Sequence, residues 1–100
     1  MPATIAMTGN VARIGLTGDF DFSNQEELRL VFEQVIDTEQ GEIELDLKMT
    51  DFIDSAVIRL FLKLLDMAEK NNKSLAIVHC NERIAEIFAI GGFDKVFDIR

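Results

Sequence analysis

The residues best placed for chemistry lie at Asp51–Ser55, where an acidic strand leads into an apolar helix. Asp54 and Ser55 are both helix-capping residue types, because their side-chain oxygens accept hydrogen bonds from free backbone N–H groups at a helix start. The sequence leaves open which of the two is the cap. A serine at such a position is usually structural. An exposed hydroxyl there is also a favourable place for a phosphate, since the helix dipole and free N–H groups attract anions.

The charged residues of the following helix indicate which side of it faces solvent. Arg59, Lys63, Asp66 and Lys70 are spaced by four, three and four residues, and almost all residues between them are apolar. Extended back by one turn, this stripe reaches Ser55, so we expect an exposed hydroxyl with Arg59 one turn away. A phosphate adds about −1.5 to −2 charges. The fold would tolerate it, whereas burying an unpaired ion beneath a partner costs several kcal/mol. Ser55 is therefore predicted to switch binding rather than folding.

The sequence gives only weak evidence for a catalytic site or a metal site elsewhere in the chain. His79 and Cys80 are the only residues of their types, and neighbours on a strand point to opposite faces, so a structural role is expected for both. Asp19, Asp21 and Asp54 could suggest a receiver domain phosphorylated on aspartate, but the chain is short for five βα units. No HExxH, CxxC or Gly-Lys-Ser/Thr motif occurs. We predict no catalytic residue, no metal site, no cofactor and no enzymatic activity.

Composition limits the class of protein. The 100 residues are 48% hydrophobic and 28% charged, which predicts one folded domain over residues 1–100. The chain has no apolar run of membrane-spanning length, its start lacks the pattern of a secretory signal, and it has one cysteine; these features predict a cytoplasmic protein. The formal net charge is −8 without a basic cluster, so we expect a protein partner rather than nucleic acid or a membrane.

The first half of the chain alternates between strand and helix signals. A hairpin is predicted over 5–17 around the turn residues 8–10, followed by a loop at Gly18–Phe22. A capping box of Ser23 and Glu26 is expected to start the first helix. Of the two phenylalanines in the loop, Phe22 is expected to pack beneath that helix, and the position of Phe20 stays open.

The second half continues the alternation. Residues 42–47 alternate strictly, which is typical of a strand with one face in solvent, and 75–78 form a short apolar run. Helices are predicted at 55–70 and from Asn81 to Gly91-Gly92, with a short strand at 96–99. The fold class is therefore α/β, with a mixed sheet of four to five strands and helices mainly on one face.

These motifs together resemble the STAS-domain family of bacterial anti-sigma factor antagonists. The strongest match is Leu45-Asp46-Leu47 followed by Phe52-Ile53-Asp54-Ser55-Ala56, which is similar to the family's strand and the Asp-Ser pair that opens a helix. Gly18-Asp19-Phe20-Asp21 resembles a Gly-x-Leu-Asp stretch before the first helix. Gly91-Gly92-Phe93, followed by Phe97, is a weaker match. The resemblance covers nearly the whole chain and implies a STAS fold.

The resemblance also implies a partner switch. Its partner would be an anti-sigma factor that is a serine kinase of the histidine-kinase-like ATPase type, bound by the unphosphorylated form. Phosphorylation of Ser55 would release that partner, and a metal-dependent Ser/Thr phosphatase would reverse the modification. The residues expected to contact the partner are Gly18, Asp19, Phe20, Asp21, Asp54, Ala56 and Arg59.

One departure and two alternatives accompany the resemblance. Many members have a small residue and then Gly after the serine, whereas Ala56-Val57 follows here, which puts the shape of the kinase-facing surface in question. STAS domains also serve in stress-signalling scaffolds and as lipid-transport accessory subunits, and the latter do not depend on a phosphorylatable serine. The tails of anion transporters are a third role, which the absence of a membrane segment argues against.

Overall fold

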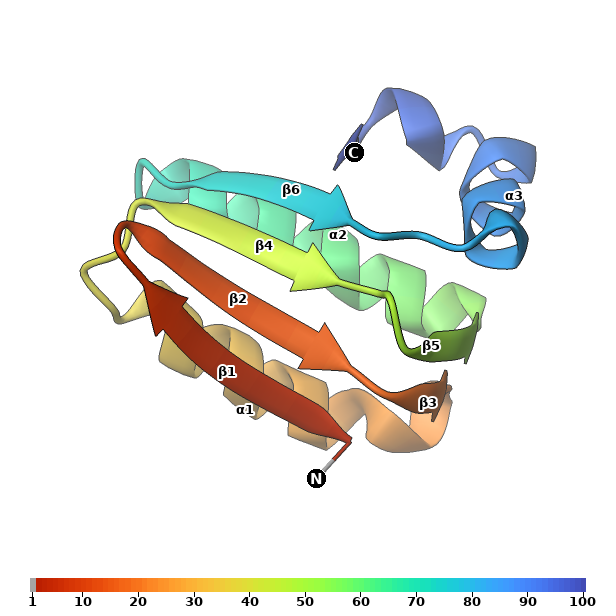
Figure 1. Cartoon of the computed structure of the whole chain (residues 1–100), viewed down its shortest axis with the longest axis horizontal. Coiled ribbons are helices and arrows are strands. Elements are labelled where there is room, and N and C mark those ends of the chain that lie inside the picture. The colour runs from red at the N-terminus through yellow and green to blue at the C-terminus, as the bar shows by residue number, and fades with distance from the viewer. Residues whose placement is uncertain (1) are drawn as a thin grey trace.

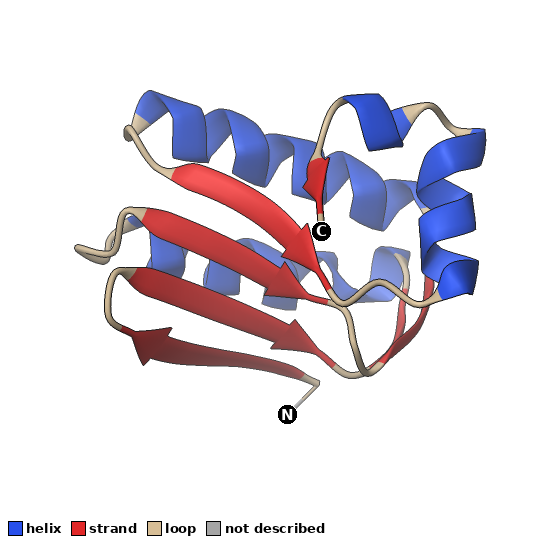
Figure 2. Ribbon diagram, turned by 45° about the horizontal axis from the view of Figure 1, so that its top comes forward, coloured by secondary structure: helices blue, strands red, loops and turns tan. Residues whose placement is uncertain are grey.

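A five-stranded mixed sheet forms the centre of the molecule, with two long helices packed on one of its faces (Figures 1 and 2). The structure is a computed structural model that describes residues 2–100. The strand order is β1-β2-β4-β6-β7, and β3 and β5 form a separate two-stranded sheet. The strands are β1 (Ala3–Thr8), β2 (Val11–Leu16), β3 (Gly18–Phe20), β4 (Glu42–Asp46), β5 (Thr50–Ile53), β6 (Ser74–Val78) and β7 (Asp98–Ile99). The helices are α1 (Gln25–Ile36), α2 (Ser55–Lys70) and α3 (Glu82–Ile90), with 3-10 turns η1 (Phe22–Asn24) and η2 (Phe93–Lys95).

The sheet topology confirms the predicted fold class. Strands β1 and β2 form the expected antiparallel hairpin, and β2, β4, β6 and β7 run parallel to one another. Helix α2 occupies the connection between β4 and β6, with the same bounds as predicted. No helix within residues 2–100 has the length and apolar content that a membrane span requires.

The core lies between the sheet and the two long helices. Alternate residues of β2 and β4 are buried, since successive strand residues point to opposite faces and only one face meets the helices. The buried residues Leu28, Phe32 and Val35 of α1 pack onto this face, and the rings of Phe32 and Phe61 join α1 to α2 with centroids 6.2 Å apart. Burying apolar area at roughly 25 cal/mol per Å² provides the main driving force for this arrangement.

The segment predicted as a loop, Gly18–Phe22, is partly a strand. Gly18–Phe20 pairs in parallel with Thr50–Ile53, which the sequence suggested only as a connection between strand and helix. Both strands are short and interrupted, so neither shows the period-two alternation that identifies a strand. A positive φ of 92° at Gly18 turns the chain out of β2 and into this second sheet.

The start of the first helix also differs from the prediction. The capping box is formed by Asp21 and Asn24 around η1, whereas Ser23 and Glu26 do not form one. Phe20 is completely buried and Phe22 is 69% exposed, so the expectation that Phe22 packs beneath the helix is wrong. Asp21 caps the 3-10 turn η1, which precedes the start of α1 at Gln25, and Phe22 is the exposed first residue of that turn.

The C-terminal part closes one edge of the main sheet. Asn81 caps α3 by accepting a hydrogen bond from the Ile84 N–H, and Gly92 takes the left-handed conformation after it, so the helix lies between the predicted limits of Asn81 and Gly91-Gly92. The last strand, β7, is shorter than predicted and pairs with β6. The rings of Phe88 and Phe97 pack edge to face and hold α3 against the chain end.

Candidate functional site

The Asp54 carboxylate organises the start of α2. Its Oδ1 accepts a hydrogen bond of 2.9 Å from the Val57 N–H, so Asp54 is the N-cap that the sequence left undecided. Its Oδ2 accepts a second bond of 2.9 Å, from the Phe22 N–H, which lies 32 residues away in the chain. One carboxylate therefore fixes α2 and η1 relative to each other.

Ser55 is the first residue of α2, and it is exposed. No hydrogen bond within residues 2–100 involves its hydroxyl, because the capping role is already taken by Asp54. Arg59, one turn further along, is exposed and forms no ion pair within the described chain, while Ala56 is only 8% exposed. The hydroxyl is thus exposed and unbonded within residues 2–100, and the Arg59 guanidinium lies on the same side of the helix.

The predicted contact residues from the two chain regions lie close together, but the side chains of Phe20 and Ala56 are buried. The Asp54 N–H donates to the Phe20 carbonyl at 3.3 Å, which places Gly18–Asp21 beside the start of α2. The side chain of Phe20 is fully buried, so it cannot contact a partner, and its inclusion among the surface residues is corrected. It instead anchors β3 in the core.

Two exposed phenylalanines belong to the segments that form this surface. Phe22 is 69% exposed and Phe52, on β5, is 43% exposed. Phe52 pairs with Asp19 across the β3–β5 ladder, so both rings come from segments hydrogen-bonded to each other or to Asp54. Sequence reasoning missed Phe52, because an apolar residue in a short connection gives no signal that distinguishes exposure from burial.

Asp21 adds a second ordered carboxylate. Its Oδ1 accepts bonds from the Ser23 hydroxyl at 2.6 Å and the Ser23 N–H at 2.8 Å. These bonds, the hydroxyl's first, hold the pKa of Asp21 below its ordinary value, so the carboxylate stays charged near neutral pH. With Asp19 and Asp51 also exposed, the surface around Ser55 is acidic.

Helix α3 supports this surface from behind. The Asn81 amide donates to the Thr50 carbonyl at 3.0 Å, and the Arg83 guanidinium donates to the Asp51 carbonyl at 3.1 Å. Thr50 is completely buried and its hydroxyl donates to the Leu16 carbonyl at 2.8 Å. These bonds hold β5, and with it Phe52 and Asp54, at a fixed position.

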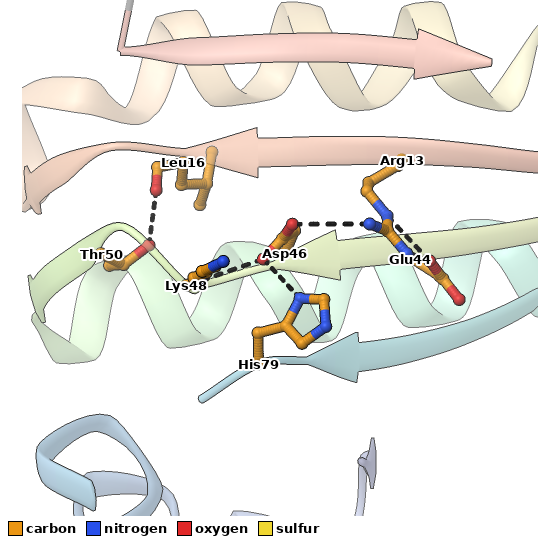
Figure 3. A network of polar contacts seen from close by, with 7 residues as sticks. All are labelled: Arg13, Leu16, Glu44, Asp46, Lys48, Thr50 and His79. Carbon is orange, nitrogen blue, oxygen red and sulfur yellow. Dashed lines mark hydrogen bonds and ion pairs between the residues drawn. The ribbon is translucent and has the colours of Figure 1, made fainter. Parts of the chain in front are cut away.

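A separate polar network covers the outer face of the sheet (Figure 3). The Arg13 guanidinium binds Glu44 at 2.6 Å and approaches Asp46 at 3.8 Å, while His79 Nδ1 lies 3.0 Å from Asp46 Oδ1. Burial would raise the pKa of Asp46, but hydrogen bonds from the Lys48 N–H and His79, together with the charges of His79 and Arg13, keep it below its ordinary value.

His79 and Cys80 lie just after β6 and do not form a reactive pair. His79 adopts a positive φ of 62° that turns its side chain onto the outer face, while Cys80 packs against the edge of the core. Burial raises the pKa of the Cys80 thiol to about 11, so it is protonated at neutral pH. Within residues 2–100 no cluster of three His, Cys, Asp or Glu side chains could hold a metal ion.

The chain belongs to the STAS domain family. A family model described as "Mlab, STAS domain" matches residues 3–99. Among curated proteins, the chain is similar to the STAS-domain containing protein PA14_20770 of Pseudomonas aeruginosa, with 29% identity over 91 residues that cover 91% of this chain and 89% of that protein.

Solved structures share the fold at low sequence identity. The Bacillus anti-sigma factor antagonist SpoIIAA in its unphosphorylated form aligns with a TM-score of 0.75 and 17% identity, over 98% of this chain and 86% of that one. A sulfate transporter family protein from Wolinella succinogenes aligns with a TM-score of 0.77 and 19% identity, over 91% of this chain and 74% of that one. The fold therefore occurs in proteins of more than one class.

Proposed function

We propose that this protein is an anti-sigma factor antagonist whose binding is controlled by phosphorylation of Ser55. The partner is an anti-sigma factor that is also a serine kinase of the histidine-kinase-like ATPase type. The unphosphorylated chain binds it, the phosphorylated chain releases it, and a metal-dependent phosphatase restores the first state. The observation that carries the proposal is the Ser55 hydroxyl, which is exposed and unbonded within residues 2–100 because Asp54 caps the helix.

The local charges support a switch of binding rather than of structure. A phosphate on Ser55 would meet free N–H groups at the helix start and the Arg59 guanidinium, so the fold accommodates it. For a docked partner, the same phosphate adds about −1.5 to −2 charges to a surface that already holds Asp19, Asp21 and Asp51. A kinase surface that fits the uncharged hydroxyl would have to desolvate the new anion without a cation to pair with it.

The exposed Phe22 and Phe52 complete the proposed contact surface. Aromatic side chains are enriched at protein interfaces because they bury large apolar areas with few rotatable bonds. Together with Ser55, Gly18, Asp19, Asp21 and Arg59, these two residues define a surface that we name the Ser55 surface; the side chain of Ala56 lies beneath it.

Phosphopeptide mapping tests the proposal directly. The chain is incubated with the cognate kinase and ATP, digested with trypsin, and the peptide Met49–Arg59 is sequenced by mass spectrometry. We expect phosphate on Ser55 and none on Thr50, which is buried and serves as an internal control. Phosphate on another residue, or none at all, would contradict the proposal.

Two substitutions test the consequence for binding. Ser55→Ala should bind the kinase normally and stay bound when ATP is added, whereas Ser55→Asp should weaken binding by about tenfold or more, equivalent to about 1.4 kcal/mol. Isothermal titration calorimetry with and without ATP measures the affinity of each variant for the kinase. Wild-type behaviour of both variants with ATP present would exclude the switch.

A second candidate is an accessory subunit that binds its partner without phosphorylation. The sequence resemblance includes this class, and the matching family model is described as "Mlab, STAS domain". Val57, which replaces the Gly that many switched members have, is a further difference. This candidate predicts that ATP and kinase leave partner binding unchanged.

A further inference from the structure

Strand β1 leaves one edge of the main sheet open. It is the first strand in the order β1-β2-β4-β6-β7, and within residues 2–100 its only strand neighbour is β2 (Figure 1). It spans six residues, Ala3–Thr8, and pairs with β2 along its whole length without a bulge. An edge of this kind presents unpaired N–H and C=O groups to any strand that approaches it.

The register identifies which backbone groups are unpaired. The Thr17 N–H donates to the Pro2 carbonyl at 2.8 Å, so this pair is of the hydrogen-bonded type. In an antiparallel ladder, hydrogen-bonded and non-hydrogen-bonded pairs alternate. Since Ala3 faces Leu16 and the register continues evenly to Thr8, the backbone groups of Ala3, Ile5 and Met7 point away from β2.

The strand also lacks the features that normally protect an edge. Its sequence, Ala-Thr-Ile-Ala-Met-Thr, has no charged residue and no proline. Met7, which is 45% exposed, adds apolar surface at one end of it. The opposite edge differs, because β7 has only two residues and its Asp98 forms an ion pair with Arg100. The contrast makes β1 the edge at which strand addition is favoured.

A second copy of this chain fits the β1 edge. Ala3, Ile5 and Met7, whose backbone groups point away from β2, can pair with the same three residues of a second copy. In an antiparallel two-fold arrangement, Ile5 faces Ile5 of the second copy, and Ala3 faces Met7. Every outward N–H then meets an outward C=O. The side chains of the same three residues lie on the helix side of the sheet, where Ala3 is buried and Ile5 packs against the core, so apolar side chains meet across the seam. No like charges are placed opposite each other on the paired strands.

We propose that this protein forms a two-fold dimer through β1, which joins two five-stranded sheets into one. The proposal does not depend on the role of Ser55. The seam involves one strand from each copy, so we expect a weak dimer with less buried area than a standard interface. Each copy carries a formal charge of −8, and added salt should therefore strengthen the association by screening the repulsion.

Sedimentation velocity over micromolar to millimolar concentrations measures the dimer. We expect a concentration-dependent monomer–dimer equilibrium whose dissociation constant falls severalfold when sodium chloride is raised. Met7→Pro removes an outward N–H without breaking a bond to β2, and it should abolish the dimer. Met7→Val keeps that N–H and is the matched control, which should still dimerise. A chain that stays monomeric throughout, or a Met7→Pro variant that dimerises like wild type, would overturn the proposal.

Amide hydrogen exchange tests the same geometry in the unmodified chain. Thr4, Ala6 and Thr8 bond to β2 and should be protected at every concentration. Ala3, Ile5 and Met7 should become protected only as the dimer forms. Protection of these three amides that does not change with concentration would show that the edge is not the interface, even if a dimer exists.

Discussion

Asp54 combines two roles that are often divided between residues. Its two carboxylate oxygens accept bonds from the N–H groups of Val57 and Phe22, so one side chain both starts α2 and fastens η1. This leaves the adjacent Ser55 without a structural task. A residue with no structural task can be modified without loss of the fold, which is the physical condition that a regulatory serine needs.

Replacing Asp54 should therefore destabilise the protein more than replacing Ser55. Asp54→Ala leaves two N–H groups without partners and should lower the free energy of unfolding by about 1.5–3 kcal/mol. Asp54→Asn retains one acceptor oxygen and should be intermediate. Ser55→Ala should change stability by less than about 0.5 kcal/mol. Urea denaturation measures all three, and equal stabilities for Asp54→Ala and Ser55→Ala would show that the double contact contributes nothing.

For single residues, the sequence predicted which helix side chains are exposed better than it predicted long-range hydrogen bonds. The exposure of Ser55 and Arg59 followed from helical spacing, because the charged stripe is a local property of one helix. The bond from the Phe22 N–H to Asp54 could not be predicted, since it joins segments 32 residues apart. The burial of Phe20 and exposure of Phe22 reversed the expectation, because the choice depends on where the helix start is capped.

The element that positions the Ser55 surface is the small β3–β5 sheet. Gly18 turns the chain away from the main sheet and its N–H donates to the Met49 carbonyl at 2.9 Å, which begins the pairing. The two strands then carry Asp19 and Phe52 side by side. A sheet of two such short strands is not stable alone, so we expect the hydrogen bonds from Asn81 and Arg83 to keep β3 and β5 in place.

Asn81→Ala tests that support. The substitution removes the cap of α3 and the donor to the buried Thr50 carbonyl, so the free energy of unfolding should fall by about 1–3 kcal/mol. Amide exchange in β5 should accelerate more than in β4. The neighbouring Glu82→Ala, at an exposed position, is the control and should be close to neutral. Unchanged exchange in β5 would mean that α3 does not hold this strand.

The long elements were predictable from the sequence, and the short ones were not. Helix α2 has the bounds that were expected, because sixteen residues carry several repeats of the 3.6-residue period. Strand β4 also followed from its alternation. Strands β3 and β5 have three and four residues, and their pairing with each other is what makes them strands. Such tertiary pairing has no local sequence signal.

The whole molecule is a sheet with helices on one face and polar side chains on the other. The outer face of the sheet and the Ser55 surface differ in how their charged side chains are paired. On the outer face, Arg13 is paired with Glu44 and lies near Asp46, whereas Asp19 and Asp21 of the Ser55 surface form no ion pair within residues 2–100. Arg13 therefore offsets part of the negative charge of the outer face, whereas Asp19 and Asp21 remain exposed where a partner is expected to bind.

This pairing predicts the acid sensitivity of the fold. The pKa of Asp46 is lower in the folded state than in the unfolded state, so its stabilising contribution is complete above the unfolded value of about 3.9 and is lost as the pH falls through the folded value. Asp46→Asn should therefore be less stable than wild type at neutral pH. The difference should shrink below about pH 4. Urea midpoints at a series of pH values measure it, and a difference independent of pH would be inconsistent with this account.

The pairing of Pro2 with Thr17 has a practical consequence for anyone who labels this protein. Pro2 is bonded to Thr17, and Thr17 directly precedes Gly18 of the Ser55 surface. A purification tag fused ahead of Pro2 would therefore lie close to this surface and hinder partner binding. The turn at Asn71-Asn72 lies at the other end of α2 from Ser55 and is exposed. A fluorophore attached at this turn could report complex formation without covering the Ser55 surface.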